Sequence, residues 1–361
     1  MALGELALRT LLFSESPTWA KLGQSLRVPG RFSCYNTPEN WKLRVLFAKE
    51  RRAQRSARRK HPHYHPILGT RRKIISLDYH HDSEPRLAGR RPILLFGDSF
   101  GQCVAAIDKC WEDLLEETEL AQEHYLLNYA VGGYGFDQIS LLLEHALPLY
   151  IEENPIVIVS LLVDDDIDRC YLPMRTYPKP FFTIGREREG EGGHGDGEVV
   201  YHAAPHLTPL DFIAANPPAI RSYLWRYILF GLPNISGHTL HSWSGHGDHV
   251  EQKKRIALYL LDKDISLLEG AGVDYFFFLF HGPVAAREDV HDWEDGFLRE
   301  YFRARDVPFI ASDEYLRKAQ QEEGAELLDY FFTEGTALSH YNDRGNRVVF
   351  EGILSGLRGE F

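Results

Sequence analysis

The sequence lacks several features that would place it in a specialised class of protein. Its 361 residues contain no apolar run of about 18 residues, so no membrane span is predicted. Its net charge of -12 argues against nucleic acid as the main partner, because binding phosphates requires a basic face. The N-terminus lacks the basic segment and long apolar core of a signal peptide, so we expect a short amphipathic segment there.

Cysteine is also scarce. The sequence contains four cysteines, Cys34, Cys103, Cys110 and Cys170, at irregular spacing. This spacing predicts neither a disulfide framework nor a zinc site. A reduced, cytoplasmic protein is therefore the default expectation.

What the sequence does contain is an alternation of apolar runs with amphipathic stretches. Strands are predicted at 92–96, 124–131, 155–163, 273–280 and 307–312, and helices at 102–118, 136–154, 250–270 and 344–357. Short apolar runs of this kind are typical of parallel strands that are buried on both faces. Residues 91–361 are therefore predicted to form a three-layer α/β/α sandwich around a five-stranded parallel sheet.

Two regions fall outside this alternation. Residues 1–90 are expected to form an N-terminal extension that packs on the α/β core, and about 170–250 a large insertion. Four histidines between positions 238 and 249 leave a metal site or a substrate-covering lid as alternatives for part of the insertion. The extension carries a basic run at 49–60, for which a solvated helix face and a surface for an anionic polymer or lipid headgroup are the two interpretations.

Unusual residues follow the carboxyl ends of the predicted strands, where open parallel sheets bind their ligands. The first strand ends in Gly97-Asp98-Ser99, the second leads to the glycine pair 132–133, and the third leads to the acidic stretch 164–168. His340 stands just before the last helix. We expect this set to converge on one site.

The set resembles the SGNH, or GDSL-type, hydrolase superfamily, and within it the branch found beside polysaccharide and cell-surface biosynthesis genes. The blocks that carry the resemblance are PILG at 66–69, GDS at 97–99, LNYAVGGYGFDQ at 127–138 and HYNDRGN at 340–346. The resemblance covers about residues 65–165 and 270–355. It implies an α/β sandwich that acts through a serine, with no cofactor and no metal ion.

The resemblance also implies a role for each matching residue. Ser99 would be the nucleophile, and His340 would be the general base that removes its proton. The backbone N–H groups of Ser99 and Gly133 would bind the oxyanion. Asp98 would hold the turn by bonding neighbouring amides.

One departure from the superfamily pattern lies in the acidic stretch. Asp165 stands where the superfamily has an asparagine that donates to the oxyanion. It could donate if crowding by Asp166 and its acidic neighbours kept it protonated. Otherwise it turns away and another group donates, or the stretch holds a divalent cation.

A second departure precedes the histidine. Ala337 stands where the superfamily has the acid that orients the base. Glu334 or Asp329 could reach the imidazole from upstream, or the protein works with a Ser-His pair.

Two more residues are expected near the cleft. Arg169 could contact an acidic group of the substrate. His281, at the end of the fourth strand, could bind substrate or act as a second base, the alternative being a histidine bonded within its own loop.

The sequence therefore predicts a serine esterase that removes a small acyl group, such as acetyl, from a glycan or a related small molecule. Acyl transfer to a sugar hydroxyl is one alternative. A non-catalytic relative that binds glycans or acts as a scaffold is the other, and the two departures favour it. The sequence indicates no oligomeric state.

Overall fold

A computed structural model describes residues 2–14, 16–70, 89–105, 109–185, 198–231, 246–287, 293–335 and 337–361. The chain divides into two compact units, one formed by residues 1–71 with 171–256 and the other by residues 72–170 with 257–361. The expected N-terminal extension and insertion thus cluster together in the first unit, which we call the helical unit. The second we call the sheet unit. That the extension packs on the sheet unit stays a prediction.

The sheet unit is built around five strands in the order β4-β3-β5-β8-β9, and every neighbouring pair is parallel. The strands are β3 (Arg91–Phe96), β4 (His124–Asn128), β5 (Ile156–Leu162), β8 (Asp274–Phe280) and β9 (Phe309–Ala311). All seven residues of β5 are buried, because helices cover both of its faces. The five-stranded parallel sheet predicted from the apolar runs is confirmed.

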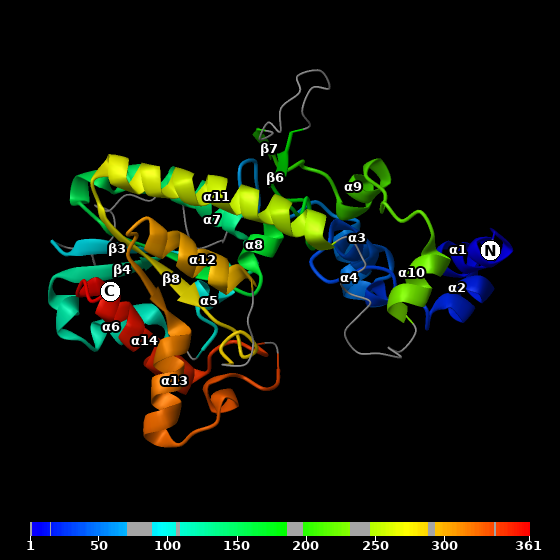
Figure 1. Cartoon of the computed structure of the whole chain (residues 1–361). Coiled ribbons are helices and arrows are strands. Elements are labelled where there is room, and N and C mark those ends of the chain that lie inside the picture. Colours follow the sequence, from blue (N-terminus) through cyan, green and yellow to red (C-terminus); the bar gives the residue numbers. More distant parts are fainter. Residues whose placement is uncertain are drawn as a thin grey trace. The chain divides into compact units, whose positions relative to one another are not determined.

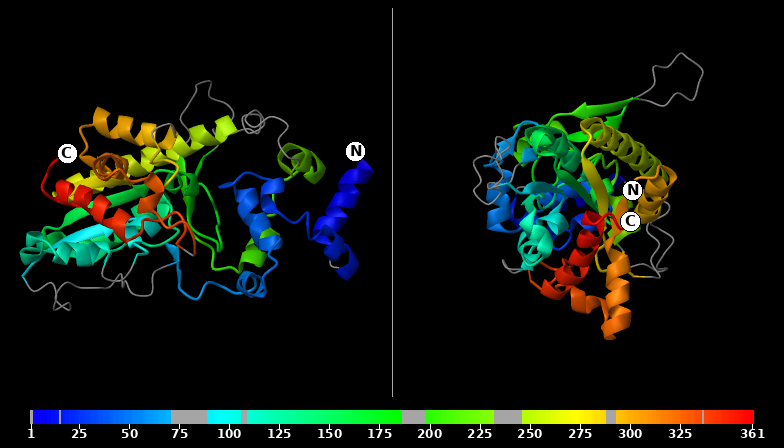
Figure 2. Two further views of the ribbon diagram at one scale, coloured as in Figure 1. Left: turned by 90° about the horizontal axis from the view of Figure 1, so that it is seen from below. Right: turned by 90° about the vertical axis from the view of Figure 1, so that its left-hand side faces the viewer.

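Helices form a layer on each face of this sheet (Figure 1 and Figure 2). One layer contains α6 (Trp111–Glu116), α13 (Ser312–Glu323) and α14 (Asp343–Leu357), and the other contains α7 (Phe136–Ala146), α12 (Trp293–Ala304) and the later part of α11 (His246–Ala271). Trp111 of α6 belongs to the same buried cluster as Ile93 and Leu95 of β3. The predicted three-layer sandwich is therefore confirmed.

The helix predicted over residues 102–118 is wrong, since two shorter helices occupy this part of the chain. The first, α5 (Ser99–Gln102), is followed by Cys103, whose φ of 61° lies in the left-handed region. Cys103 forms a disulfide with Cys110, a bond that the irregular cysteine spacing did not predict. Helix α6 begins only after this disulfide, at Trp111.

Shorter elements complete the sheet unit. They are η5 (Glu119–Gln122), η6 (Leu147–Leu149), η7 (Ile151–Glu153), α8 (Asp166–Arg169) and η9 (Leu327–Tyr330). The helix predicted over 136–154 thus continues past α7 only as separate 3-10 turns.

The helical unit combines two distant stretches of the chain. Its elements are α1 (Ala2–Phe13), α2 (Pro17–Gly23), η1 (Pro29–Arg31), α3 (Pro38–Leu46), α4 (Arg51–Ala57), β1 (Tyr64–His65), β2 (Gly69–Thr70), β6 (Phe181–Ile184), β7 (Val199–His202), α9 (Pro209–Ala215), α10 (Tyr223–Arg226) and η8 (Tyr227–Gly231). One core packs Leu8 and Phe32 against Tyr223, and a second packs Trp41 against Phe212. Each core needs both stretches of the chain.

Two segments singled out in the insertion lie largely outside the described residues. The Gly-rich stretch at 185–198 is described only at its two ends, and of the histidine-rich stretch at 234–249 only the last four residues are described, at the start of α11. Where the chain is described, no helix combines the length and apolar character needed to cross a bilayer.

Candidate active site

Ser99 stands at a sharp turn between β3 and α5. Asp98 caps the short helix, its carboxylate accepting a hydrogen bond of 2.8 Å from the N–H of Phe100. Gly97 is required at the turn, because a Cβ there would lie 2.0 Å from the hydroxyl oxygen of Ser160 on β5. The turn leaves the Ser99 side chain partly exposed at the carboxyl end of the central strand.

His340 reaches this serine from the other end of the chain. Its Nε2 lies 2.8 Å from Oγ of Ser99, although the two residues are 241 positions apart. The ring of Phe100 stacks on the imidazole, with centroids 4.8 Å apart and planes 24° from parallel. Like Ser99, His340 is partly exposed, so the pair is open to a substrate.

A backbone carbonyl faces the second imidazole nitrogen. Nδ1 of His340 lies 3.3 Å from the carbonyl oxygen of Leu338. Because a carbonyl only accepts hydrogen bonds, this contact fits the neutral tautomer that carries its proton on Nδ1, and in that tautomer the lone pair of Nε2 faces Ser99. Of the two acids proposed to orient the imidazole, Asp329 bonds the N–H of Glu326 instead, and among the described residues no contact joins Glu334 to the ring.

The predicted glycine pair lies beside Ser99. A Cβ added to Gly132 would be 3.6 Å from that of Ser99, and the N–H of Gly132 donates to the side chain of Gln102 at 2.6 Å. Gly133 has a φ of 85°, which favours glycine there. Its role in binding an oxyanion stays a prediction.

Asp165 is turned onto an arginine. Its carboxylate forms an ion pair with the guanidinium of Arg169, one turn along α8. A carboxylate in this pairing is an acceptor, so it is a poor candidate for an oxyanion donor, which corrects the first of the two interpretations of this residue. In the described part of the chain, no group of three or more His, Cys, Asp or Glu side chains is arranged to hold a metal ion.

Arg169 does not face the substrate as expected. Its side chain is only 5% exposed and bonds Asp98 at 3.1 Å and Asp166 at 2.7 Å in addition to Asp165. Burial lowers the pKa of Arg169, but the neighbouring carboxylates, Asp165 first, raise it by more than burial lowers it. The net shift is upward, so Arg169 stays charged. Arg169 is thus the buried counter-ion of the turn that carries Ser99.

Asp98 and Asp166 share this arginine beneath the serine. The second oxygen of Asp98 lies 3.2 Å from Oγ of Ser99. Asp166 accepts from the N–H of Leu162 at 2.8 Å and is fully buried. Burial first, and then the charge of Asp98, raises the pKa of Asp166 well above its ordinary value. The turn-holding role predicted for Asp98 therefore has a geometric basis in these contacts.

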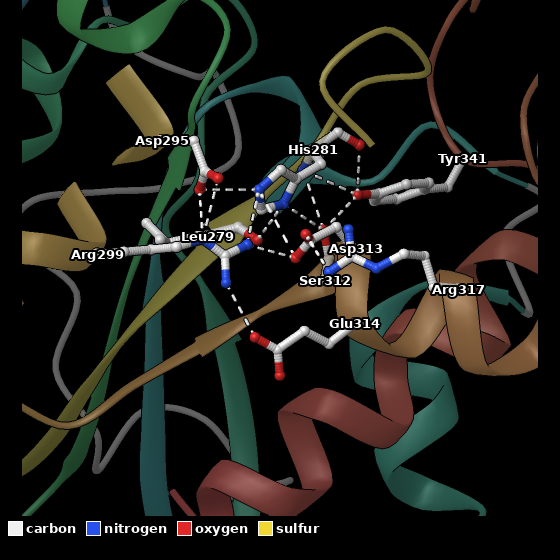
Figure 3. Close-up of polar contacts among 9 residues, drawn as sticks. All are labelled: Leu279, His281, Asp295, Arg299, Ser312, Asp313, Glu314, Arg317 and Tyr341. Carbon is white, nitrogen blue, oxygen red and sulfur yellow. Dashed lines mark hydrogen bonds and ion pairs between the residues drawn. The ribbon is translucent and has the colours of Figure 1, made fainter. Parts of the chain in front are cut away.

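His281 is fully buried. It lies within a cluster of polar side chains (Figure 3). Its Nδ1 lies 3.1 Å from the Ser312 hydroxyl and its Nε2 lies 3.1 Å from Asp295. Arg299 bridges Asp295 and Asp313 in the same cluster, at 2.8 Å and 2.6 Å. Because His281 is buried, the expectation that it binds substrate or acts as a base is wrong. Its side-chain partners Asp295 and Ser312 lie on other elements, so the alternative of a histidine bonded within its own loop does not describe it either.

Sequence reasoning missed two aromatic residues next to the serine and the histidine. Phe100 follows Ser99 and stacks on His340, and Tyr341 follows His340 and packs edge-on against Phe100 with centroids 5.1 Å apart. The signal available was their position immediately after the two proposed catalytic residues. Nothing in the spacing indicated that the two rings meet.

Comparisons with known proteins add little to this geometry. No protein-family model matches the chain, and no curated protein matches it. Among solved structures, the chain is similar to the crystal structure of an acetyl xylan esterase, with 13% identity and a TM-score of 0.39, over 74% of this chain and 99% of the esterase. A likeness of this size carries no argument about activity, so the function depends on the site itself.

Proposed function

We propose that this chain is a serine esterase of the SGNH type that removes a small acyl group, such as acetyl, from a glycan or a related small molecule. The observation that carries the proposal is the 2.8 Å contact between Oγ of Ser99 and Nε2 of His340. Serine and histidine make this contact in enzymes where the histidine activates the serine as a nucleophile.

The proposed reaction has two halves. As Oγ of Ser99 attacks the ester carbonyl, its proton passes to Nε2 of His340, and the imidazolium then protonates the departing alkoxide. The resulting acyl-enzyme is hydrolysed when His340 takes a proton from water and returns it to Oγ. The Leu338 carbonyl holds the imidazole in the required tautomer throughout, in the place where other enzymes use a carboxylate.

Backbone donors are the best candidates for stabilising the oxyanion. Among the described residues, the N–H of Ser99 donates to no acceptor, as expected for the first residue of a helix. With Asp165 paired to Arg169, the N–H of Ser99 is the donor that the geometry favours for the oxyanion, and the part of Gly133 stays as the resemblance implies it.

Covalent labelling tests the proposal directly. A fluorophosphonate probe is expected to label the purified chain at Ser99, and Ser99→Ala is expected to abolish both labelling and hydrolysis of p-nitrophenyl acetate. His340→Gln should lower both by a factor of at least about 1,000, because the nucleophile loses its base. Ser355→Ala, which removes a serine hydroxyl on α14 that bonds Glu360, is the matched control and should retain both.

Two outcomes would overturn the proposal. One is labelling that survives in Ser99→Ala. The other is an acetate hydrolysis rate that is the same in Ser99→Ala, His340→Gln and the unmodified chain, because the measured activity would then not depend on the pair.

A further inference from the structure

The helical unit contains a cavity of about 330 Å³ that the proposed esterase does not use. Its walls come from α3, α4 and the segment at 175–176, and they include Trp41, Arg44, Glu50, Arg52, Ala53 and Arg175. This volume is near the lower end of the range for ligand sites, about 300–1,000 Å³. The cavity therefore suits a molecule the size of one sugar ring.

Three arginines and a tryptophan dominate the lining. The Cζ atoms of Arg44 and Arg175 lie 4.6 Å and 4.7 Å from the ring centroid of Trp41. Stacking of this kind orients a guanidinium while leaving the N–H groups at its edge able to bind an acceptor. Trp41 is 7% exposed, and its indole N–H has no hydrogen-bond partner among the described residues. The lining thus places several hydrogen-bond donors around the cavity.

Two of the three arginines in the lining have no acidic partner in the part of the chain that the structure describes. Glu50 is the single acidic residue in the lining, and within the described ranges neither Arg44 nor Arg52 forms an ion pair. The basic run at 49–60 forms part of the wall of the cavity and extends beyond it. Among the described residues, five more of its exposed cations form no ion pair, and these are Arg51, Arg55, Arg58, Arg59 and Lys60. Such a concentration of unpaired cations in a chain of net charge -12 points to an anionic ligand.

We propose that this cavity binds an anionic sugar, one that carries a carboxylate or a phosphate group, and that the adjoining basic run contacts further anionic groups of the same oligosaccharide. Arg44 and Arg52 supply charge-assisted hydrogen bonds to the anionic group. The small apolar side chains of Val45, Ala48 and Ala53, which line the cavity and are partly or fully exposed, supply the surface against which the C–H faces of a sugar ring pack. The proposal is independent of the esterase, since it concerns binding alone.

A membrane surface fits the same features less well. Helix α4 has the sequence RRAQRSA, which contains no large apolar side chain to insert among acyl chains. A flat layer of anionic headgroups would also contact all the exposed cations of the run to a similar extent, and it would not enter a cavity. A concave site beside a charged run favours a discrete anionic group on a longer chain.

Binding of two defined sugars to the full-length chain tests the proposal. Labelled trigalacturonate is the carboxylate probe and mannose 6-phosphate the phosphate probe, and the neutral methyl ester of trigalacturonate is the matched ligand. We expect saturable binding of at least one anionic sugar, with the methyl ester at least about tenfold weaker than trigalacturonate if the carboxylate probe binds. Ser99→Ala should bind these sugars as the unmodified chain does. Sugar binding can therefore be tested whether or not the proposed esterase activity is found.

Two arginine variants distinguish the cavity from the run as a whole. Arg52→Gln and Arg59→Gln each remove one exposed charge, but only Arg52 lines the cavity. We expect Arg52→Gln to weaken binding at least about tenfold and Arg59→Gln to weaken it less than about threefold. Equal losses in the two variants would overturn the proposal. So would tighter binding to phosphatidylserine vesicles or duplex DNA, or no saturable binding of either sugar up to about 10 mM.

Discussion

At the scale of single residues, Tyr341 connects the proposed base to the interior of the sheet unit. Its hydroxyl donates to the carbonyl of His281 at 2.8 Å and lies 2.9 Å from the Ser312 hydroxyl. The N–H of His281 donates back to it at 3.2 Å (Figure 3). His340 is therefore held between this buried anchor and the stacked ring of Phe100, so Tyr341 is a positioning residue for the proposed reaction.

Tyr341→Phe tests this role. The ring stays and the hydroxyl is lost, so the backbone near His340 gains freedom while the serine is untouched. We expect kcat for p-nitrophenyl acetate to fall about tenfold with KM little changed, because the pair is misaligned in a fraction of molecules. Tyr330→Phe is the control: it also removes a tyrosine hydroxyl, here one bonded to Glu323 at 3.1 Å, and should leave kcat within about twofold. A similar fall in kcat in both variants would contradict the positioning role.

At the scale of elements, the contact between α7 and α11 includes a buried acid. Asp264 is fully buried and accepts a hydrogen bond of 2.5 Å from Ser140. Burial raises the pKa of Asp264 from 3.8 to about 7, although the bond from Ser140 opposes the shift. The folded state therefore favours the protonated carboxyl, and the stability of the unit should fall as the pH rises from about 4 through about 7.

Asp264→Asn should remove this pH dependence. The amide keeps an acceptor for Ser140 and carries no charge, so we expect it to raise the free energy of unfolding at pH 8 by about 2–4 kcal/mol and to change it little at pH 4. Glu144→Gln is the matched control, since Glu144 joins the same two helices through an exposed ion pair with Lys263. It should change stability by at most about 1 kcal/mol. Denaturant unfolding at pH 4 and pH 8 measures the free energy of unfolding of both variants. If Asp264→Asn changed it equally at the two pH values, the ionisation of Asp264 would not explain the change.

The contact between α1 and α10 depends on an acid whose pKa is lowered rather than raised. Glu5 of α1 accepts from the backbone N–H groups of Tyr223 and Leu224 and from the Ser222 hydroxyl, and so caps α10. Burial raises the pKa of Glu5, but these hydrogen bonds outweigh it and lower the pKa to about 2. The stabilisation is complete above pH 4.5 and is lost as the pH falls through about 2.

Glu5→Gln should therefore destabilise the helical unit at neutral pH and lose this effect in acid. The difference in unfolding midpoint between the variant and the unmodified chain should narrow steadily between pH 4.5 and pH 2. Thermal unfolding at several pH values measures it. A difference that does not change with pH would show that the Glu5 carboxylate is not what joins α1 to α10.

At the scale of the whole molecule, the two units differ in how their backbone is protected. β5 pairs with β3 on one side and β8 on the other and is buried throughout, whereas the helical unit has short helices and two small cores. We expect hydrogen exchange to be slowest in β5 and β8 and measurably faster throughout residues 2–70. Exchange at one uniform rate in both units would contradict this difference.

The sheet and the position of the serine could be predicted from the sequence because both depend on local patterns. Apolar runs define the strands, and residues at their carboxyl ends share one edge of the sheet. The misassigned residues depend on distant partners: His281 bonds Asp295 and Ser312, which lie 14 and 31 positions away. Arg169 is a different case, since Asp165 and Asp166 stand four and three residues before it, a helical spacing that could have indicated the ion pairs.

Phe100 has a consequence for how the edge of the sheet can move. It is the residue after Ser99, and its ring is the surface on which the imidazole of His340 rests. A displacement of α5 therefore carries the nucleophile and the platform of its base together. Thermal motion at this edge should change the position of the pair within the molecule more than the separation between its two members.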